Sequence, residues 1–466
     1  MNKQLRLLTV DEAKSMPIEQ MTELFMAHLN PGQYHFMKLL GFHKIKIESA
    51  EGMWLVDQNG RRILDFFGGF GSLSFGHNHP RILAARTAFQ SENRHEIAMA
   101  FLSQYASALA YNLAAIAPGD LEMVFLGSTG SEAMEAALKV AERAQGPGRS
   151  KVLYAQNSFH GKTKGALSIT DSSLYQSSFK LLSNNVRVPF GDLDAIKRAI
   201  ETDSQIGMVC LETIQGGGGI IEAPTEFWQG LRALCDKHNV LWIADEVQCG
   251  TGRTGKFFAF EHYGVVPDVT ALAKSLGGGK AAVGAMIATT EVYKRAYGTP
   301  ATALIHGPAT FGGIGEACVT AIEALNVMYD EKLLENTDAM GAYLTSELQR
   351  LMQKYPKLIK DVRGRGMMMG LELHDLSSAM PKAVTPLLAP LDEKLKGSLS
   401  GFIGSAMLRE HNVLVAFTEY NRNVIRLQPP LTVTSKHIDI FIQALDAVLA
   451  RGLTRIIMDF VKSQRG

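Results

Sequence analysis

The spacing of apolar positions changes along the chain, and it predicts the secondary structure. Near the start, apolar side chains recur every three or four positions, as in Met21, Leu24, Phe25 and Leu29. This spacing predicts that residues 1–45 are helical and partly amphipathic. Residues 53–66 contain two apolar runs around Asn59-Gly60, a strong turn signal, so we expect a β-hairpin there.

From about residue 120, short apolar runs alternate with helical stretches. Six runs are predicted as strands, at 122–126, 151–155, 207–214, 240–245, 268–273 and 283–288. Helices are predicted between several of them, at 131–144, 192–201 and 225–238. This alternation, with nearly unbroken apolar strands, predicts a mostly parallel, buried sheet. Ligands of such sheets bind beyond the carboxyl ends of the strands, so candidate site residues are sought there.

The chain after about residue 335 mixes helices with short strands and predicts a smaller unit. We expect an α/β fold in three parts. Residues 1–75 form an N-terminal segment that joins the small domain, residues 76–334 form a large domain, and residues 335–466 form a C-terminal small domain.

Composition and charge narrow the class of protein without indicating its chemistry. The 47 basic and 46 acidic residues give a net charge of +1, so no nucleic-acid partner is predicted. No apolar run is long enough to span a bilayer, and the first residues lack the apolar core of a signal peptide. The four cysteines form no C-x-x-C pair. We therefore expect a soluble cytoplasmic protein without a membrane partner.

Lys274 directly follows the predicted strand 268–273, in the segment Ala-Lys-Ser-Leu-Gly-Gly-Gly. A buried ammonium is unfavourable unless it is paired or neutralised, so a lysine at this position is unusual. An imine with an aldehyde cofactor is one chemical solution, and the glycines at 277–279 let the backbone approach a bulky ligand. A surface lysine that opens a loop explains the position equally well.

Asp245 ends another hydrophobic strand, where a carboxylate also requires a partner. A protonated pyridine nitrogen is suitable, because the ion pair keeps the ring electron-withdrawing. A helix N-cap or a salt bridge to Arg253 is the alternative interpretation.

Residues 128–132 read Ser-Thr-Gly-Ser-Glu and precede a predicted helix. Thr129 and Glu132 have the spacing of a capping box. The free N–H groups at a helix start form a natural phosphate site, to which Gly130 gives access and the Thr129 and Ser131 hydroxyls add donors. An ordinary capped helix start explains the segment as well.

Four other motifs carry weaker signals. The aromatic ring in Phe159-His160-Gly161, after a predicted strand, is placed to stack on a flat cofactor, although a lone aromatic more often belongs to a core. Gly250–Lys256 nearly matches a P-loop, but Phe257 stands where a Ser or Thr should hold magnesium. Gly69-Phe70-Gly71 is only a fragment of a dinucleotide-binding fingerprint. His77-Asn78-His79 lacks a clear third ligand, so no metal site is predicted.

Taken together, these pieces resemble the class III aminotransferases, which use pyridoxal phosphate (PLP) on the fold-type I scaffold. The strongest match is 243–279, where Asp-Glu-Val-Gln, Gly-Arg-Thr-Gly, Pro-Asp and the lysine occur in the family's order. Asp245 and Lys274 lie 29 positions apart (274 − 245). The resemblance covers about residues 50–450, and within the class it is closest to the ornithine, acetylornithine and putrescine aminotransferase group. It implies a large PLP-binding domain, a smaller α/β domain, and a homodimer with active sites at the interface.

The resemblance also implies a role for each matching position. Lys274 would hold the cofactor as a Schiff base and move the substrate proton, and Asp245 would pair with the pyridine nitrogen. The other cofactor-binding positions are Thr129, Gly130, Ser131, Phe159, His160, Val247, Gln248 and Thr310, the last reaching the partner subunit's phosphate. Arg426 would bind the carboxylate of a keto acid or amino acid. Glu212 would pair with that arginine for substrates that lack an α-carboxylate.

The implied reaction moves an amino group from a primary amine or ω-amino acid, such as a diamine or an ornithine- or GABA-like donor, to a keto acid such as 2-oxoglutarate or pyruvate. Several residues depart from the family pattern, and these departures bear on substrate preference. They are Ser128 for a common asparagine, Thr213 and Gly217 for the usual proline and second glutamate, Ile314-Gly315 for Asn-Pro, and an irregular segment at 376–402.

Three other readings stay open at this point. A racemase, aminomutase or decarboxylase on the same scaffold is the first. A nucleotide-binding enzyme built on Gly250–Lys256 is the second, and a catalytically inactive binding protein on this scaffold is the third.

Overall fold

A seven-stranded sheet lies at the centre of the large domain. The computed structural model describes residues 6–97, 100–306, 309–375 and 398–463. The strand order is β4-β10-β9-β8-β7-β5-β6. The bounds are β4 (Leu121–Gly127), β5 (Lys151–Ala155), β6 (Val186–Val188), β7 (Ile206–Glu212), β8 (Leu241–Asp245), β9 (Val269–Leu272) and β10 (Gly284–Thr289). The strands from β6 to β9 are parallel, whereas β10 runs antiparallel to both β9 and β4.

The mostly parallel sheet predicted from the sequence is confirmed. Each of the six predicted runs is a strand, with ends within two residues of the expected positions. The prediction missed β6, which has only three residues. It also gave no sign that β10 is antiparallel, because an apolar run does not encode its direction.

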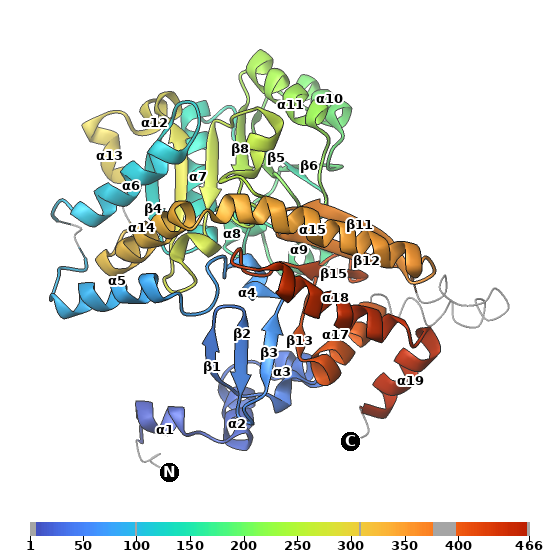
Figure 1. The fold of residues 1–466 in the computed structure, drawn as a ribbon. Helices are drawn as coiled ribbons and strands as arrows, with labels where there is room; N and C mark the ends of the chain where they lie inside the picture. Colours follow the sequence, from blue (N-terminus) through green and yellow to red (C-terminus); the bar gives the residue numbers. More distant parts are fainter. Residues whose placement is uncertain (1–5, 98–99, 307–308, 376–397, 464–466) are drawn as a thin grey trace, which may run out of the picture.

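Helices cover both faces of this sheet (Figure 1). The three predicted helices are present as α7 (Gly130–Gln145), α10 (Leu193–Thr202) and α11 (Thr225–His238). The apolar face of α7 packs on alternate strand residues such as Ile243 and Met286. On the other face, Trp228 of α11 stacks on Trp242 of β8. The sheet is therefore buried on both sides, which explains its almost unbroken apolar strands.

Two smaller four-stranded sheets lie below the large one in Figure 1. The first is β1 (Ile47–Glu51), β2 (Trp54–Asp57), β3 (Arg62–Asp65) and β13 (Val413–Leu414). The second is β11 (Ile359–Arg365), β12 (Met368–Leu373), β15 (Val424–Leu427) and β14 (Ala416–Phe417).

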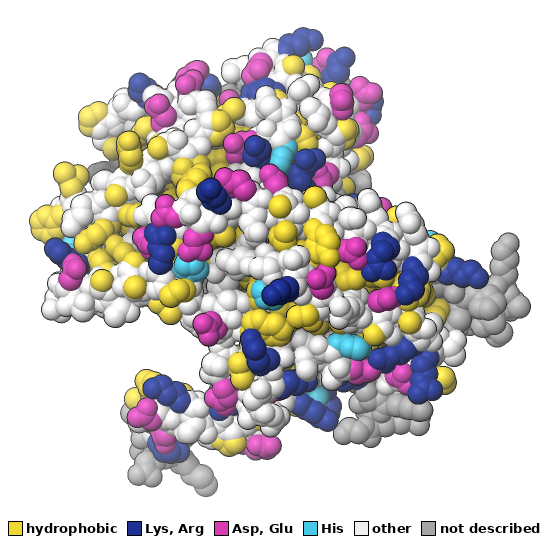
Figure 2. Space-filling view, in the orientation of Figure 1, with side chains coloured by type: hydrophobic (Ala, Val, Ile, Leu, Met, Phe, Trp, Pro, Cys, Tyr) yellow, Lys and Arg dark blue, Asp and Glu magenta, His cyan; other side chains and the backbone are white. Residues whose placement is uncertain are grey.

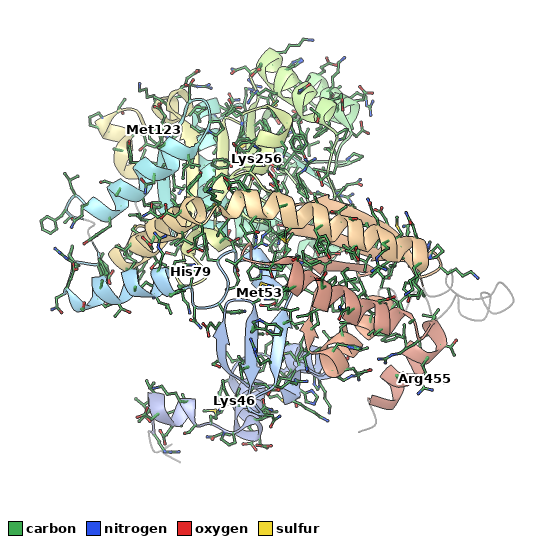
Figure 3. All side chains as sticks on the ribbon, viewed as in Figure 1. Lys46, Met53, His79, Met123, Lys256 and Arg455 are labelled. Carbon is green, nitrogen blue, oxygen red and sulfur yellow. The ribbon has the colours of Figure 1, made fainter. Side chains whose placement is uncertain are left out.

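The predicted hairpin at Asn59-Gly60 is confirmed as β2–β3. Leu64 of β3 pairs in parallel with Val413 of β13, so the N-terminal hairpin joins a strand from the far end of the chain. Buried Met53 lies where this sheet meets the rest of the molecule (Figure 3). The domain boundaries at residues 75 and 334 stay predictions.

The remaining helices surround these sheets. The helical character predicted for residues 1–45 is confirmed in the part that the structure describes, as α1 (Val10–Lys14), α2 (Ile18–His28) and α3 (Pro31–Leu40). The others are α4 (Gly68–Gly71), α5 (Pro80–Ser91), α6 (Gln104–Ile116), α8 (Lys164–Leu167), α9 (Ser173–Ser178), α12 (Thr290–Tyr297), α13 (Pro300–His306), α14 (Gly315–Asp330), α15 (Leu333–Lys354), α17 (Ser398–His411), α18 (Ser435–Leu449) and α19 (Leu453–Ser463). Within the described residues, no helix combines the length and apolar character that a membrane span requires.

Candidate active site

A pocket of about 460 Å³ opens at the carboxyl ends of β5, β7, β8 and β9. The predicted site residues that line it are Thr129, Gly130, Ser131, Phe159, His160, Glu212, Asp245, Val247, Gln248, Lys274 and Arg426. These residues come from segments that are far apart in sequence. Most of them follow parallel strands, whose carboxyl ends share one edge of the large sheet, whereas Arg426 comes from β15 of a smaller sheet.

Asp245, the last residue of β8, is buried and forms an ion pair with His160. The Nδ1 atom of His160 lies 2.7 Å from Oδ2 of Asp245, and Oδ1 accepts a hydrogen bond from Val247 N at 3.0 Å. Burial lowers the pKa of His160, but the hydrogen bond and charge of Asp245 outweigh it and the pKa is raised. The sequence-based alternative, a salt bridge from Asp245 to Arg253, is wrong, because His160 supplies the partner.

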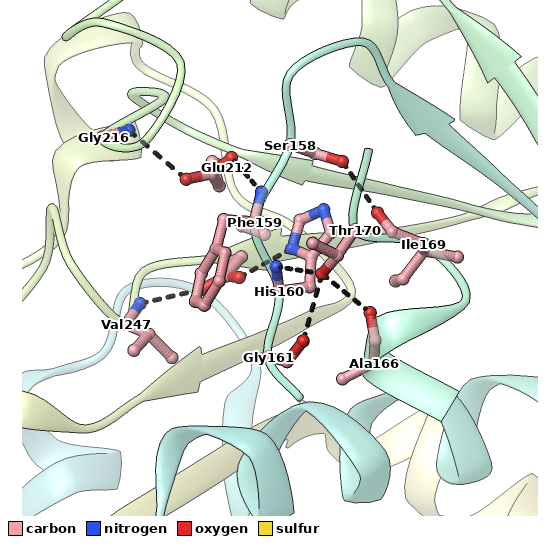
Figure 4. Close-up of polar contacts among 12 residues, drawn as sticks. Ser158, Phe159, His160, Gly161, Ala166, Ile169, Thr170, Glu212, Gly216 and Val247 are labelled. Carbon is pink, nitrogen blue, oxygen red and sulfur yellow. Dashed lines mark hydrogen bonds and ion pairs between the residues drawn. The ribbon is translucent and has the colours of Figure 1, made fainter. Parts of the chain in front are cut away.

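Hydrogen bonds to two neighbouring segments hold the loop that carries Phe159 and His160 (Figure 4). His160 N donates to Thr170 Oγ1 at 2.9 Å, and Ser158 Oγ donates to Ile169 O at 2.7 Å. On the other side, Phe159 N donates to the carboxylate of Glu212 at 3.0 Å. The position of His160 against Asp245 is therefore fixed by its own backbone.

Lys274 leaves β9 after the single linking residue Ala273. Its φ of 48° lies in the left-handed region, which costs about 1–3 kcal/mol for a residue with a side chain. Burial lowers the pKa of the Lys274 ammonium, and Arg426 lowers it further against the opposing charge of Asp245. The next residue anchors the backbone, because Ser275 Oγ donates to Gly71 O at 2.7 Å. The amine is thus held in the pocket with its charged form disfavoured.

The start of α7 forms the other end of the pocket. Thr129 is the N-cap, and its hydroxyl accepts from Glu132 N at 3.1 Å. The predicted capping box is wrong in one half, because the Glu132 carboxylate accepts from Ser128 N instead of Thr129 N. A Cβ on Gly130 would lie 2.9 Å from Val247 Cγ1, so glycine is required for this close approach. The free N–H groups here can bind an anion.

Arg426 of β15 is 2% exposed, and its guanidinium carbon lies 4.5 Å from the centre of the Phe70 ring. Its Nε and Nη2 atoms are buried without a hydrogen-bond partner among the described residues. Burial lowers the pKa of Arg426 to about 10, which leaves the side chain charged at neutral pH. Two free donors on a cation at the pocket wall suit a bidentate carboxylate ligand.

Glu212, at the end of β7, is not hydrogen-bonded to Arg426 in this structure. Its carboxylate accepts from Phe159 N at 3.0 Å and Gly216 N at 3.3 Å. Burial raises the pKa of Glu212 to about 8; the His160 charge opposes this, and the Asp245 charge adds to it.

Residues 40–449 match the family model described as aminotransferase class III. The chain belongs to the class III aminotransferases. Enzymes of this family depend on PLP and transfer an amino group from an amine to a keto acid. The chain is therefore a PLP-dependent transaminase of class III.

Solved structures of other transaminases agree with this membership. The ornithine aminotransferase of Toxoplasma gondii ME49 is 27% identical with a TM-score of 0.81, over 96% of this chain and 100% of that one. A transaminase from the marine bacterium Virgibacillus is 25% identical with a TM-score of 0.82, over 96% and 100%. An amine transaminase from an uncultivated Pseudomonas species, in its PLP-bound form, is 29% identical with a TM-score of 0.77, over 87% and 95%.

The polar groups of the pocket fit the cofactor of a class III aminotransferase. The start of α7 with Ser131 suits the phosphate, and Asp245 suits the pyridine nitrogen. The Lys274 amine suits the aldehyde. The Oε1 atom of Gln248 is buried without a partner in the described part of the chain, so it is free to contact a ring substituent. Phe159 and Val247 line the pocket as the apolar walls that a ring requires.

Thr310 is the one predicted site residue that does not line this pocket. It is exposed in the segment after α13. Its expected contact is with a second subunit, so that role stays a prediction.

Two of the pocket residues that were missed at the sequence level have side chains that bear on Arg426. Phe70, which stacks on Arg426, belongs to a glycine-rich turn that was noted only as a fragment of a nucleotide motif. Its φ of 58° is the kind of strain that such a turn carries at a functional site. Glu419 also lines the pocket, and nothing in its sequence surroundings marks it.

The other weak motifs have structural roles. Arg253, in Gly250–Lys256, is fully buried and donates to Met367 O, Pro429 O, Gly71 O and Ser74 Oγ. His77 Nε2 lies 2.9 Å from Asp65 Oδ2. The described residues contain no group of ligands that could hold a metal ion.

Proposed function

We propose that this class III aminotransferase takes the amino group of a primary amine or ω-amino acid, such as a diamine or an ornithine- or GABA-like donor. The acceptor is a keto acid such as 2-oxoglutarate or pyruvate. One observation carries the proposal, namely that the Lys274 amine shares a pocket with the two unpartnered donors of Arg426. Transamination requires both groups in one pocket, because an amine reacts in the first half-reaction and the carboxylate of a keto acid is bound in the second.

Lys274 is the proton carrier in this proposal. When bound, PLP supplies an electron sink that stabilises the negative charge left after removal of the substrate Cα proton. Burial lowers the pKa of Lys274, so its Nζ is available as the base that removes this proton and returns it. The hydrogen bond from Ser275 to Gly71 anchors the chain next to Lys274, which lines the pocket.

Asp245 and His160 act as a unit. The Asp245 carboxylate would hold the pyridine nitrogen of PLP in its protonated form, and His160 fixes the orientation of that carboxylate through the 2.7 Å contact. Burial of the pair strengthens this interaction because little water screens it.

We also propose a homodimer in the cytoplasm. Large apolar side chains are exposed near Thr310 in sequence and on the loop before α6: Phe101 (74%), Leu102 (98%), Ile305 (56%) and Phe311 (59%). Figure 2 shows apolar side chains gathered over α5, α6 and α14 on the same side of the molecule. Such a surface favours burial in an interface. The four buried, unpaired cysteines fit a reducing compartment.

Replacement of the central lysine tests the proposal. Borohydride treatment of the PLP-loaded protein should fix the cofactor to Lys274, as read by peptide mass spectrometry. Lys274→Ala should lower kcat by at least about 1000-fold, the scale of losing a general base and a covalent anchor. Lys139→Ala, an exposed lysine of α7, is the matched control. Full turnover by Lys274→Ala, with donors screened against pyruvate and 2-oxoglutarate, would sink the proposal.

A further inference from the structure

The guanidinium of Arg426 lacks an anion. It is almost fully buried, it remains charged, and two of its nitrogen atoms have no hydrogen-bond partner among the described residues. A keto acid supplies the missing carboxylate in one half of the reaction. A donor amine without an α-carboxylate does not, and an unpaired buried cation is unfavourable. Some other anion is therefore needed while the amine occupies the pocket.

Three acidic side chains line the pocket, and two of them are already committed. Asp245 is paired with His160. Glu212 accepts two backbone hydrogen bonds and takes up a proton near neutral pH, because burial raises its pKa to about 8. The third is Glu419, whose carboxylate has no hydrogen bond within the described part of the chain. Burial lowers the pKa of Arg426, and the negative charge of Glu419 acts in the opposite direction and raises it.

The residues on both sides of Glu419 are anchored, whereas its own carboxylate has no hydrogen bond among the described residues. Tyr420 N donates to Gly217 O at 3.1 Å, and Tyr420 Oη donates to Ser158 O at 3.1 Å. Thr418 N donates to Val424 O at 3.2 Å, which closes the turn between β14 and β15. Glu419 itself is exposed at the pocket mouth. This anchoring holds the carboxylate within reach of the pocket without locking it in one position.

Gly217 lies next to the Glu419 carboxylate. A Cβ at Gly217 would lie 3.5 Å from Glu419 Oε2 and 3.4 Å from Tyr420 Cε2. The sequence departs from its family at this position, where a glutamate is usual. The carboxylate of Glu419, in the β14–β15 turn, thus lies beside residue 217, where this chain has a glycine in place of the usual glutamate.

We propose that Glu419 is the counter-ion of Arg426. It pairs with the guanidinium while an amine donor without an α-carboxylate fills the pocket, and it gives way to the carboxylate of the keto acid in the second half-reaction. This inference rests on the proposed function. It assigns the donor class, since Glu419 favours donors that bring no carboxylate of their own and competes with those that do.

The test uses PLP-loaded protein and two readouts. The first is calorimetric binding of glutarate, which has the two carboxylates of 2-oxoglutarate but no carbonyl that can react. The second is the rate of each half-reaction, followed by cofactor absorbance, with propylamine or L-alanine as donor. The variants are Glu419→Gln, Glu419→Gln combined with Gly217→Glu, and Glu335→Gln as an exposed control on α15.

Glu419→Gln should bind glutarate about tenfold more tightly and react with propylamine about tenfold more slowly. The added Gly217→Glu should restore both values towards those of the wild type, and Glu335→Gln should change neither. Unchanged glutarate binding, or tighter binding with an unchanged propylamine rate, overturns the role of Glu419. If the wild type transfers no amino group to any keto acid, the proposed function fails, while glutarate binding still tests the pairing of Glu419 with Arg426.

Discussion

At the scale of one residue, the buried carboxyl of Glu212 makes the stability of the protein depend on pH. Burial raises its pKa from 4.5 to about 8, so the folded protein holds a proton that the unfolded chain releases. A raised carboxyl pKa gives a contribution that is complete below about pH 4.5 and is lost as the pH rises towards 8.

Glu212→Gln should therefore change the pH dependence of stability. The quantity to follow is the free energy of unfolding of the variant minus that of the wild type. It should rise by about 2 kcal/mol between pH 5.5 and 8, because only the wild type loses stability there. One titrating group can contribute at most about 1.4 kcal/mol per pH unit. Denaturant titration of the cofactor-free proteins measures it. The exposed Glu226→Gln of α11 is the control and should give a flat difference. A flat difference for Glu212→Gln as well contradicts the buried, protonated carboxyl.

The sequence identified single residues best where an apolar run ends in a charge. Lys274 and Asp245 stand out for that reason. The pairing of Asp245 with His160 could not be predicted in this way. His160 lies 85 positions earlier (245 − 160), and only the parallel pairing of the strands brings the two residues together. Glu419 was missed because an exposed glutamate in a turn has no unusual sequence surroundings.

At the scale of elements, the join between α7 and the loop after β8 fixes the anion-binding end of the pocket. A Cβ on Gly130 would lie 2.9 Å from Val247 Cγ1 and 3.3 Å from Ala273 Cβ. The helix can start this close to β8 and β9 only because residue 130 has no side chain.

Gly130→Ala should push the start of α7 away from Val247. We expect PLP to bind about tenfold more weakly and the free energy of unfolding to fall by about 1–3 kcal/mol, the usual cost of overpacking. Fluorescence titration with PLP and denaturant unfolding measure these changes. Adding Val247→Ala removes the clashing methyl groups and should recover most of the loss of stability. Gly148→Ala, which meets nothing within 4 Å, should be neutral. An equal loss in the double variant would contradict the steric explanation.

Element prediction succeeded where the pattern is long and periodic. The six strands and three helices of the large domain follow from apolar runs and 3.6-residue spacing. The three-residue strand β6 and the antiparallel direction of β10 did not follow, since neither changes the order of apolar and polar positions. Pairing between β3 and β13 is also hidden, because nothing local links residues about 350 positions apart.

At the scale of the whole molecule, Arg253 holds three regions together. Its guanidinium donates to carbonyls of the N-terminal segment, of the β11–β12 turn and of the segment after β15. It also donates to Ser74 Oγ at 2.9 Å, and Ser74 Oγ lies 2.6 Å from the hydroxyl of Ser275, next to Lys274. The planar fork of an arginine reaches all of these acceptors, and a lysine ammonium does not.

Arg253→Lys should lower the free energy of unfolding by about 3 kcal/mol, because buried carbonyls lose their donors. Arg149→Lys is the matched control. That arginine also donates to three carbonyls, those of Ile206, His238 and Asn239, but it lies partly exposed at one edge of the large sheet. Water replaces its lost hydrogen bonds, so we expect a loss below about 1 kcal/mol. Similar losses measured by denaturant unfolding would remove the linking role of Arg253.

The pairing of β3 with β13 sets an order for events during synthesis on the ribosome. The large sheet contains all of its strands once Thr289 has emerged. The sheet that begins with β1 waits for Val413 and Leu414, and Arg426 reaches the Phe70 ring later still. A nascent chain therefore carries Lys274 and Asp245 well before it carries Arg426. The group proposed to bind the keto-acid carboxylate therefore reaches its place only after the strands of the large sheet have emerged.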